Sequence, residues 1–176
     1  RYASYLILKF KPKNDTKFLK KKFKNLRYQR LEKISLHTPS ISEHSAIIAK
    51  KMEVRKILKK FQINFSKKYK NCCIEGRDIS TNILPKSDVK FFFKCNLKIA
   101  SIRRYKQLKN KKMHLNLKDV KKALRIRNIL DSSRKNSPLL KHRDSIEIDT
   151  GKLDKKAMMI KMSKCVERVI KKKYGN

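Results

Sequence analysis

The chain has 176 residues and 39% hydrophobic content, enough for one domain or for one domain with a small satellite. Its 50 Lys and Arg against 14 Asp and Glu give a formal net charge of +36. Because no apolar run of membrane length and no secretory segment occur, we expect a cytoplasmic protein without a membrane partner.

The positive charge leaves two interpretations open. A surface this basic attracts polyanions, and it is typical of ribosomal and other nucleic-acid-binding proteins. An AT-rich genome would encode the same high content of Lys, Asn and Ile in a protein that has no nucleic-acid function. Because the lysines are spread along the chain and are not gathered in a tail or arm, composition alone favours the second interpretation.

The first part of the chain predicts helices. Residues 2–10 have an apolar helical pattern, and the basic stretch 11–37 predicts one short helix with loose connections. Thr38 followed by Pro39 is typical of an N-cap and a first helical position, so a helix is expected to begin there. The next helix has one apolar face with the spacing i, i+3, i+4, i+7 and i+11, formed by Val54, Ile57, Leu58, Phe61 and Phe65.

The second part of the chain changes to the pattern of strands. The runs "CCIE" (72–75) and "VKFFFKC" (89–95) suit strands that are buried on both faces of a parallel sheet, and "SIEID" (145–149) alternates. Strands that alternate with helices predict an α/β fold. The helical patterns lie at 97–109, 118–130 and 154–173, the last with Met158, Met162, Val166, Val169 and Ile170 expected to face inward.

The cysteines predict neither a metal site nor a disulfide framework. They form no C-x-x-C pair, and the adjacent Cys72 and Cys73 are poorly arranged for a metal or a disulfide. We expect all four to be small buried residues of strands and a helix: Cys72, Cys73, Cys95 and Cys165. No metal ligand is predicted from the histidines either, because their spacing fits no known ligand pattern.

A Gly-Arg-Asp tripeptide follows the first predicted strand, where ligands bind in an α/β sheet. Gly76 lets the backbone turn or a ligand approach, and Arg77 can bind phosphate or carboxylate through two hydrogen bonds. Asp78 can accept hydrogen bonds from an amino group. Taken alone, the tripeptide fits an ordinary Arg–Asp ion pair at a strand end better than a nucleotide site.

The wider sequence resembles the cytidylate kinase family, the bacterial (d)CMP kinases. "IEGRDISTNILPKSDVKFFFKCNLKIASIRRYKQL" carries the family's strand, Gly-Arg-Asp, hydroxyl residue (Thr81), Pro85, Asp88, second strand and Arg-Arg-Tyr helix. The similarity extends through "LHTPSISEHSAIIAKKMEVRKIL" upstream and through "RIRNILDSSRKNSPL" and "IEIDT" downstream, and covers almost everything from residue 36 onward. It implies a P-loop nucleoside-monophosphate-kinase fold, with a parallel sheet flanked by helices.

The resemblance also implies an activity and a domain plan. The activity is ATP-dependent phosphoryl transfer to CMP or dCMP, with these nucleotides as partners, nucleic acid bound weakly and non-specifically at most, and a monomeric state. The alternatives are a small basic RNA-binding or ribosomal-type protein, and a related kinase for UMP, AMP or dTMP. The plan comprises a helical, reduced CMP-binding side (1–70), core strands and helix (71–116), a lid (117–140), and the last core strand with the C-terminal helix (141–176).

For the CMP site, the resemblance implies roles for five residues. Asp78 and Arg55 occupy the family's positions that face the amino group and the acceptors of cytosine. Uracil has a carbonyl group where cytosine has its amino group, so it would place an acceptor against the Asp78 carboxylate. A polar site left unpaired in this way rejects a molecule of nearly the same shape. Arg77 and Arg1 match the arginines that hold the CMP phosphate. The family's serine near the base aligns with Ala46, and the neighbouring Ser45 is the candidate contact.

The lid carries the predicted catalytic residues. Arg127, Asp131 and Arg134 have the spacing i, i+4, i+7, which predicts one helical face. The resemblance implies that Arg127 and Arg134 meet phosphates, and that Asp131 binds the sugar or orients Arg134. A surface salt bridge is the alternative. Arg103 and Arg104 either reach the ATP side or are solvated cations.

The chain contains no phosphate loop. Such a kinase needs Gly-x-x-x-x-Gly-Lys-[Ser/Thr], and the three glycines stand at 76, 151 and 175. In the family this loop lies upstream of a Ser-Gly-x-x-Tyr-Arg segment whose arginine matches Arg1, and the chain begins with that residue in place of Met. We therefore expect a C-terminal fragment, inactive alone, for which most of the ATP and Mg²⁺ site lies before residue 1.

Overall fold

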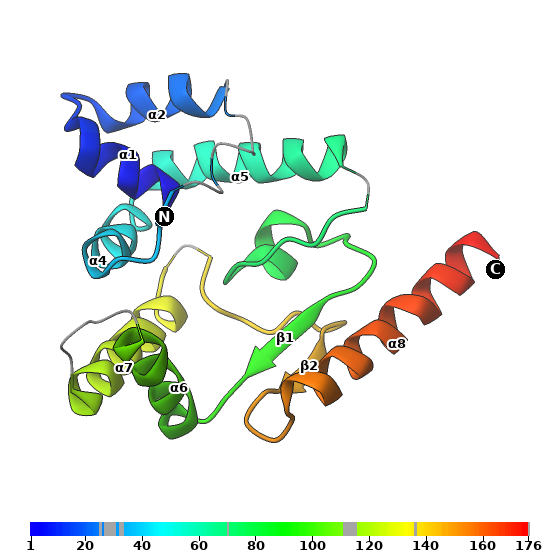
Figure 1. Cartoon of the computed structure of the whole chain (residues 1–176). Helices are drawn as coiled ribbons and strands as arrows, with labels where there is room; N and C mark the ends of the chain where they lie inside the picture. The colour runs from blue at the N-terminus through cyan, green and yellow to red at the C-terminus, as the bar shows by residue number, and fades with distance from the viewer. Residues whose placement is uncertain are drawn as a thin grey trace. The chain divides into compact units, whose positions relative to one another are not determined.

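A computed structural model shows two compact units, Arg1–Ile74 and Glu75–Asn176, which are described separately (Figure 1). The first unit is helical, and the second combines helices with a small parallel sheet. The residues that the structure describes are 1–24, 26, 31, 34–69, 71–110, 116–135 and 137–175.

The first unit contains the helices predicted for it. The short helix expected within 11–37 is present, although several residues from 25 to 33 lie outside the described part. The helix predicted at Thr38 begins as expected, because the Thr38 hydroxyl oxygen accepts a hydrogen bond from the Ile41 N–H at 3.3 Å. The helices are α1 (Tyr2–Phe10), α2 (Asp15–Lys24), α4 (Pro39–Ile48) and α5 (Met52–Lys68).

The apolar face of α5 forms the core of the first unit. Val54 is fully buried, Ile57 and Leu58 pack beside it, and the fully buried Leu19 approaches from α2. The Phe23 ring lies edge-on to Phe61, with centroids 5.3 Å apart, a favourable aromatic geometry. The helical spacing predicted for α5 is confirmed, because the residues at positions i, i+3 and i+4, which are Val54, Ile57 and Leu58, are the ones that pack in the core.

The second unit is built on a pair of parallel strands (Figure 1). Phe91 pairs with Ile146 and Lys94 with Asp149, and the fully buried Ile148 anchors the second strand. Two helices that pack on each other connect the strands, so an α/β class with a parallel sheet is confirmed. The elements are a π-helical turn (Ile79–Ile83), β1 (Phe91–Lys94), α6 (Leu97–Lys109), α7 (Leu117–Ser132), β2 (Ile146–Asp149) and α8 (Lys155–Tyr174).

The strand predicted at 72–75 is not formed. These residues adopt no regular secondary structure, and Cys72 and Cys73 are exposed, so the expectation that both are buried is wrong. A parallel strand needs a neighbouring ladder for its N–H and C=O groups. Within the described ranges the sheet contains β1 and β2 alone, and Phe93 of β1 is 50% exposed, so burial of β1 on both faces is also wrong.

The last helix is long relative to the sheet that it follows. Its 20 residues span about 30 Å, whereas strands of four residues span about 13 Å. Met158, Met162 and Val169 are half-buried as predicted, but Val166 and Ile170 are exposed, because a helix of this length extends past its support. Neither α8 nor any other helix in the described ranges is both long and apolar enough to cross a membrane.

A pH-dependent contact joins β1 and β2. Hydrogen bonds from Lys94 and Lys141 hold the pKa of the Glu147 carboxyl below its ordinary value. A lowered folded-state pKa gives stability that is present above the unfolded pKa, about 4.3, and is lost as the pH falls through the folded one. Melting temperature measured from about pH 6 to pH 3 is therefore expected to fall less steeply in Glu147→Gln than in the wild type. Identical slopes would contradict this assignment.

Candidate functional site

The second unit gathers three arginines around one carboxylate. The Asp131 carboxylate lies 3.2 Å from Arg77 Nε, 3.7 Å from Arg127 Nε and 3.4 Å from Arg134 Nη1. We call these four residues the Asp131 cluster. Arg127 and Asp131 lie on α7, Arg134 follows the end of that helix at Ser132, and Arg77 comes from the distant Gly-Arg-Asp segment. Arg127, Asp131 and Arg134 were predicted to share a helical face, and this is wrong for Arg134, because α7 ends at Ser132, two residues before it. The contact with Arg77 joins the cluster to the other predicted motif.

The Asp131 cluster has a surplus of positive charge. One carboxylate faces three guanidinium groups, which leaves two charges uncompensated within the cluster. Burial lowers the pKa of Arg77, Asp131 raises it, and the neighbouring Arg127 and Arg134 lower it. Arginine nevertheless stays protonated at any physiological pH. An additional anion, such as a phosphate, would complete the charge balance.

Arg134 and Asp131 also present polar atoms without hydrogen bonds. Within the described residues, Nε and Nη2 of Arg134 and Oδ2 of Asp131 are buried and have no hydrogen-bond partner. The arginines that approach Oδ2 do so at ion-pair distance but without hydrogen-bond geometry. Buried donors without a partner are rare in proteins, and a bound ion, a water molecule or a catalytic role commonly accounts for them. The two Arg134 donors are therefore suited to bind the oxygen atoms of an anion.

Asp78 lies beside this cluster in the chain and is buried, with 8% of its surface exposed. Its carboxylate accepts a hydrogen bond from Asn82 Nδ2 at 3.4 Å. The same amide donates to the hydroxyl of Ser137 at 2.6 Å. A carboxylate has about four acceptor sites, so Asp78 has the capacity to accept from a ligand amino group in addition to Asn82 and its other contacts.

Gly76 has a packing role in this segment. A Cβ atom at this position would lie 2.7 Å from Cγ1 and 2.9 Å from Cδ1 of Ile79, closer than real contacts allow. Glycine therefore lets the Ile79 side chain pack directly on the backbone before Arg77. We predicted either a turn or close approach of a ligand, and the structure shows close approach of a neighbouring side chain.

Three predicted site residues, Arg1, Ser45 and Arg55, belong to the first unit. Arg1 lies 2.6 Å from His37 Nδ1, and Arg55 donates to the Ala49 carbonyl oxygen at 3.5 Å, among other contacts. The Ser45 hydroxyl donates to the Ile41 carbonyl oxygen at 2.6 Å and lies 3.0 Å from the hydroxyl of the buried Ser4. All three side chains thus have partners within their own unit.

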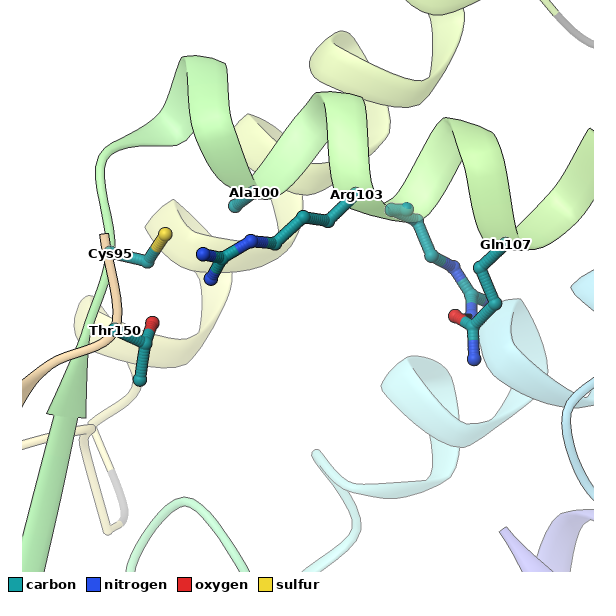
Figure 2. Close-up of a pocket in the computed structure, with 6 residues that line it drawn as sticks. Cys95, Ala100, Arg103, Gln107 and Thr150 are labelled. Atoms are coloured by element: carbon teal, nitrogen blue, oxygen red, sulfur yellow. Dashed lines mark hydrogen bonds between the residues drawn. The ribbon is translucent and has the colours of Figure 1, made fainter. Parts of the chain in front are cut away.

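A pocket of about 560 Å³ lies at the carboxyl ends of β1 and β2, the edge where α/β proteins bind ligands. Figure 2 shows the Arg103 guanidinium turned toward Cys95 and Thr150, the residues that follow the two strands. Arg104 donates to the Gln107 side chain at 2.6 Å. The pocket is lined by Cys95, Ala100, Arg103, Arg104, Gln107 and Thr150.

Metal ligands do not gather in the described part of the chain, where no group of three His, Cys, Asp or Glu side chains could hold an ion. The sequence prediction missed Asn82, Ser137 and Thr150 as neighbours of the site. Asn82 stands four residues after Asp78, a spacing that could have suggested their contact. The partnership of Asn82 with Ser137 spans 55 residues and has no local signal.

Comparisons with known proteins agree on one family. A sequence profile of the family described as "Cytidylate kinase" matches residues 4–168. The chain is 36% identical over 140 residues to a cytidylate kinase of Clostridium tetani, which covers 80% of this chain and 62% of the relative. It is 34% identical to a cytidylate kinase of Clostridium botulinum, an alignment that covers 76% of this chain and 61% of the relative. It is 35% identical to a cytidylate kinase of Mesomycoplasma hyopneumoniae, an alignment that covers 77% of this chain and 59% of the relative. The chain spans about three fifths of the length of these curated relatives.

Proposed function

The chain belongs to the cytidylate kinase family, and on this basis we propose that the protein transfers the γ-phosphoryl group of ATP to CMP or dCMP. The Asp131 cluster is the observation that carries the proposal. Phosphoryl transfer is catalysed mainly by positioning and by neutralising the negative charge that develops on the transferred group. The surplus positive charge of the three arginines supplies the neutralisation, and the unpartnered donors of Arg134 supply the positioning. The RNA-binding alternative gains no support from the relatives named above.

We assign the arginines of the cluster to phosphates. Arg77, with Arg1 of the first unit, would hold the CMP phosphate, whereas Arg127 and Arg134 would contact the group in transfer. Asp131 would keep the three cations at one place before substrate arrives, since they would otherwise repel one another. It would also orient Arg134, whose free donors Nε and Nη2 can then form the paired hydrogen bonds that phosphate oxygens favour.

We assign Asp78 and Arg55 to the cytosine base. Asp78 would accept from the N4 amino group, and Arg55 would donate to the N3 and O2 acceptors. Burial of Asp78 supports this assignment, because a desolvated carboxylate discriminates more strongly between a donor and an acceptor than an exposed one. To donate to the base, the Ser45 hydroxyl would have to leave the Ile41 carbonyl oxygen, whereas it could accept from the cytosine amino group without moving.

ATP would approach from the pocket at the strand ends, where Arg103 and Arg104 supply positive charge. Magnesium, which neutralises nucleotide phosphates, accompanies ATP in phosphoryl transfer generally. The described residues offer no carboxylate group of three to hold it, so we derive no step through the ion. We further propose the nucleoside-monophosphate-kinase fold, with residues 1–70 on the CMP side, 71–116 and 141–176 in the core, and 117–140 as lid.

The proposal is tested by CMP-dependent formation of ADP from ATP by the complete gene product. Arg127→Ala is expected to lower kcat/KM for CMP by about 10²- to 10³-fold, the effect of removing one donor to transition-state charge. Arg125→Ala removes an exposed arginine two positions away on α7 and is the matched control, with an expected effect below about twofold. Equal losses in the two variants would refute the role of Arg127. Absence of CMP-dependent turnover in the wild type would refute the proposed function.

A further inference from the structure

Asn82 links two segments that lie far apart in the sequence. Its Nδ2 group carries two hydrogens, and it lies within hydrogen-bond distance of Asp78 Oδ2 and of Ser137 Oγ. Asp78 precedes the π-helical turn, and Ser137 follows α7, beyond the Asp131 cluster. One side-chain amide therefore joins the carboxylate assigned to the cytosine base with the end of the proposed lid.

The backbone of the turn places Asn82 over Asp78. The Asp78 carbonyl oxygen accepts from the N–H groups of both Asn82 and Ile83, at 3.0 and 3.2 Å. The wider ring of a π-helical turn, closed again by Leu84 N–H to Ile79 oxygen at 2.7 Å, returns residue 82 toward the side chain of residue 78.

The contacts of the Asn82 side-chain amide with Ser137 and with Asp78 differ in length. At 2.6 Å the contact with Ser137 is short, whereas 3.4 Å to Asp78 is long for an N–H···O hydrogen bond. The contact with Ser137 is therefore the stronger of the two, and it holds the amide within reach of the Asp78 carboxylate. The contact with the carboxylate also sets the orientation of the amide, because the reverse orientation would bring Oδ1 of Asn82 against a negative charge.

Ser137 is itself held in an unusual conformation beside the cluster. Its φ of 54° is in the left-handed region, which residues other than glycine rarely adopt. Two residues later, the Leu139 N–H donates to the Asp131 carbonyl oxygen at 2.7 Å. Arg77 meets the Asp131 carboxylate, and Asp78 meets Ser137 through Asn82, so neighbouring residues of the Gly-Arg-Asp segment are both tied to the same region.

We propose that Asn82 is a positioning residue. It couples the position of the segment after α7, which contains Ser137, to the orientation of the Asp78 carboxylate, and it thereby raises selectivity for cytosine over uracil. The inference rests on the proposed function. When the segment containing Ser137 is in place, the amide holds Oδ2 of Asp78, and the remaining acceptor sites of that carboxylate keep one orientation toward an amino group. When the segment is displaced, this restraint is lost.

The test compares kcat/KM for CMP and for UMP in the complete gene product. Asn82→Leu keeps the approximate volume and removes both donors. It is expected to lower the CMP-to-UMP ratio by up to about tenfold, the low end of what a hydrogen bond to a charged group contributes, because the contact with Asp78 is long. Ser137→Ala removes only the distal acceptor and is expected to lower the ratio by a smaller factor. In the double variant the ratio should be no lower than in Asn82→Leu, because both substitutions break one linkage.

Asn116→Ala is the matched control. Asn116 caps the start of α7 by accepting from the Asp119 N–H at 2.8 Å, so its loss destabilises the helix that leads to the Ser137 segment without touching Asp78, and the CMP-to-UMP ratio is expected to stay constant. An unchanged CMP-to-UMP ratio in Asn82→Leu and Ser137→Ala, with equal losses for both nucleotides, would overturn the inference and leave the proposed function intact. If Asn82→Leu does not fold, the ratio in Ser137→Ala alone decides. Absence of CMP-dependent turnover in the wild type overturns both.

Discussion

Asp131→Asn is expected to abolish most turnover and to destabilise the second unit by on the order of 3 kcal/mol, as when one partner is removed from a buried ion pair. The Asp131 side chain is only 14% exposed and faces three arginines. Asparagine keeps the shape but removes the single negative charge, so three guanidinium groups remain in mutual repulsion. The loss of stability is measured by urea unfolding, as a shift of the midpoint at constant slope.

Salt provides a second readout for Asp131→Asn. Ions screen repulsion between charges that are partly exposed, and Arg77 and Arg127 are 38% and 45% exposed. The stability of the variant is therefore expected to rise with ionic strength more steeply than that of the wild type. Asp119→Asn, in the first turn of the same helix, is the matched control and should cost less than about 1 kcal/mol. If the two variants were equally stable, Asp131 would not hold the cluster together.

Asp78→Asn is expected to change nucleotide selectivity more than any other single substitution in the second unit. The amide replaces a charged acceptor with a group that can also donate. For CMP, kcat/KM should fall by about ten- to a hundredfold, the range of a hydrogen bond to a charged group. For UMP it should stay constant or rise, because the new N–H can face the O4 carbonyl of uracil. The measurement is kcat/KM for both nucleotides under identical ATP.

The control for Asp78→Asn is Asp88→Asn. Asp88 is an exposed carboxylate of the same unit whose pKa is lowered by a hydrogen bond from Lys173, at 2.7 Å. Its substitution alters a surface ion pair and should leave selectivity unchanged. Equal declines for CMP and UMP in Asp78→Asn, with a constant ratio, would show that Asp78 supports the fold and does not distinguish the bases.

Much of the local structure is determined by the sequence alone. The α4 boundary follows from a hydroxyl cap and a proline with a preset φ, and the inward face of α5 follows from the spacing of Val54, Ile57 and Leu58. The spacing of Arg127 and Asp131 likewise predicted that both lie on one face of a helix. In each case the interacting residues stand within about one or two helical turns, so the physical cause lies inside a short window of sequence.

Contacts over long separations required the tertiary structure. The approach of Arg77 to Asp131, and of Asn82 to Ser137, depends on how the chain returns after α6 and α7, and no local pattern encodes that path. Residues 72–75 have the composition of a buried strand, yet composition cannot supply the neighbouring ladder that a strand requires. Val166 and Ile170 fit the helical period but are exposed, because burial depends on what lies opposite a helix face as well as on its own pattern.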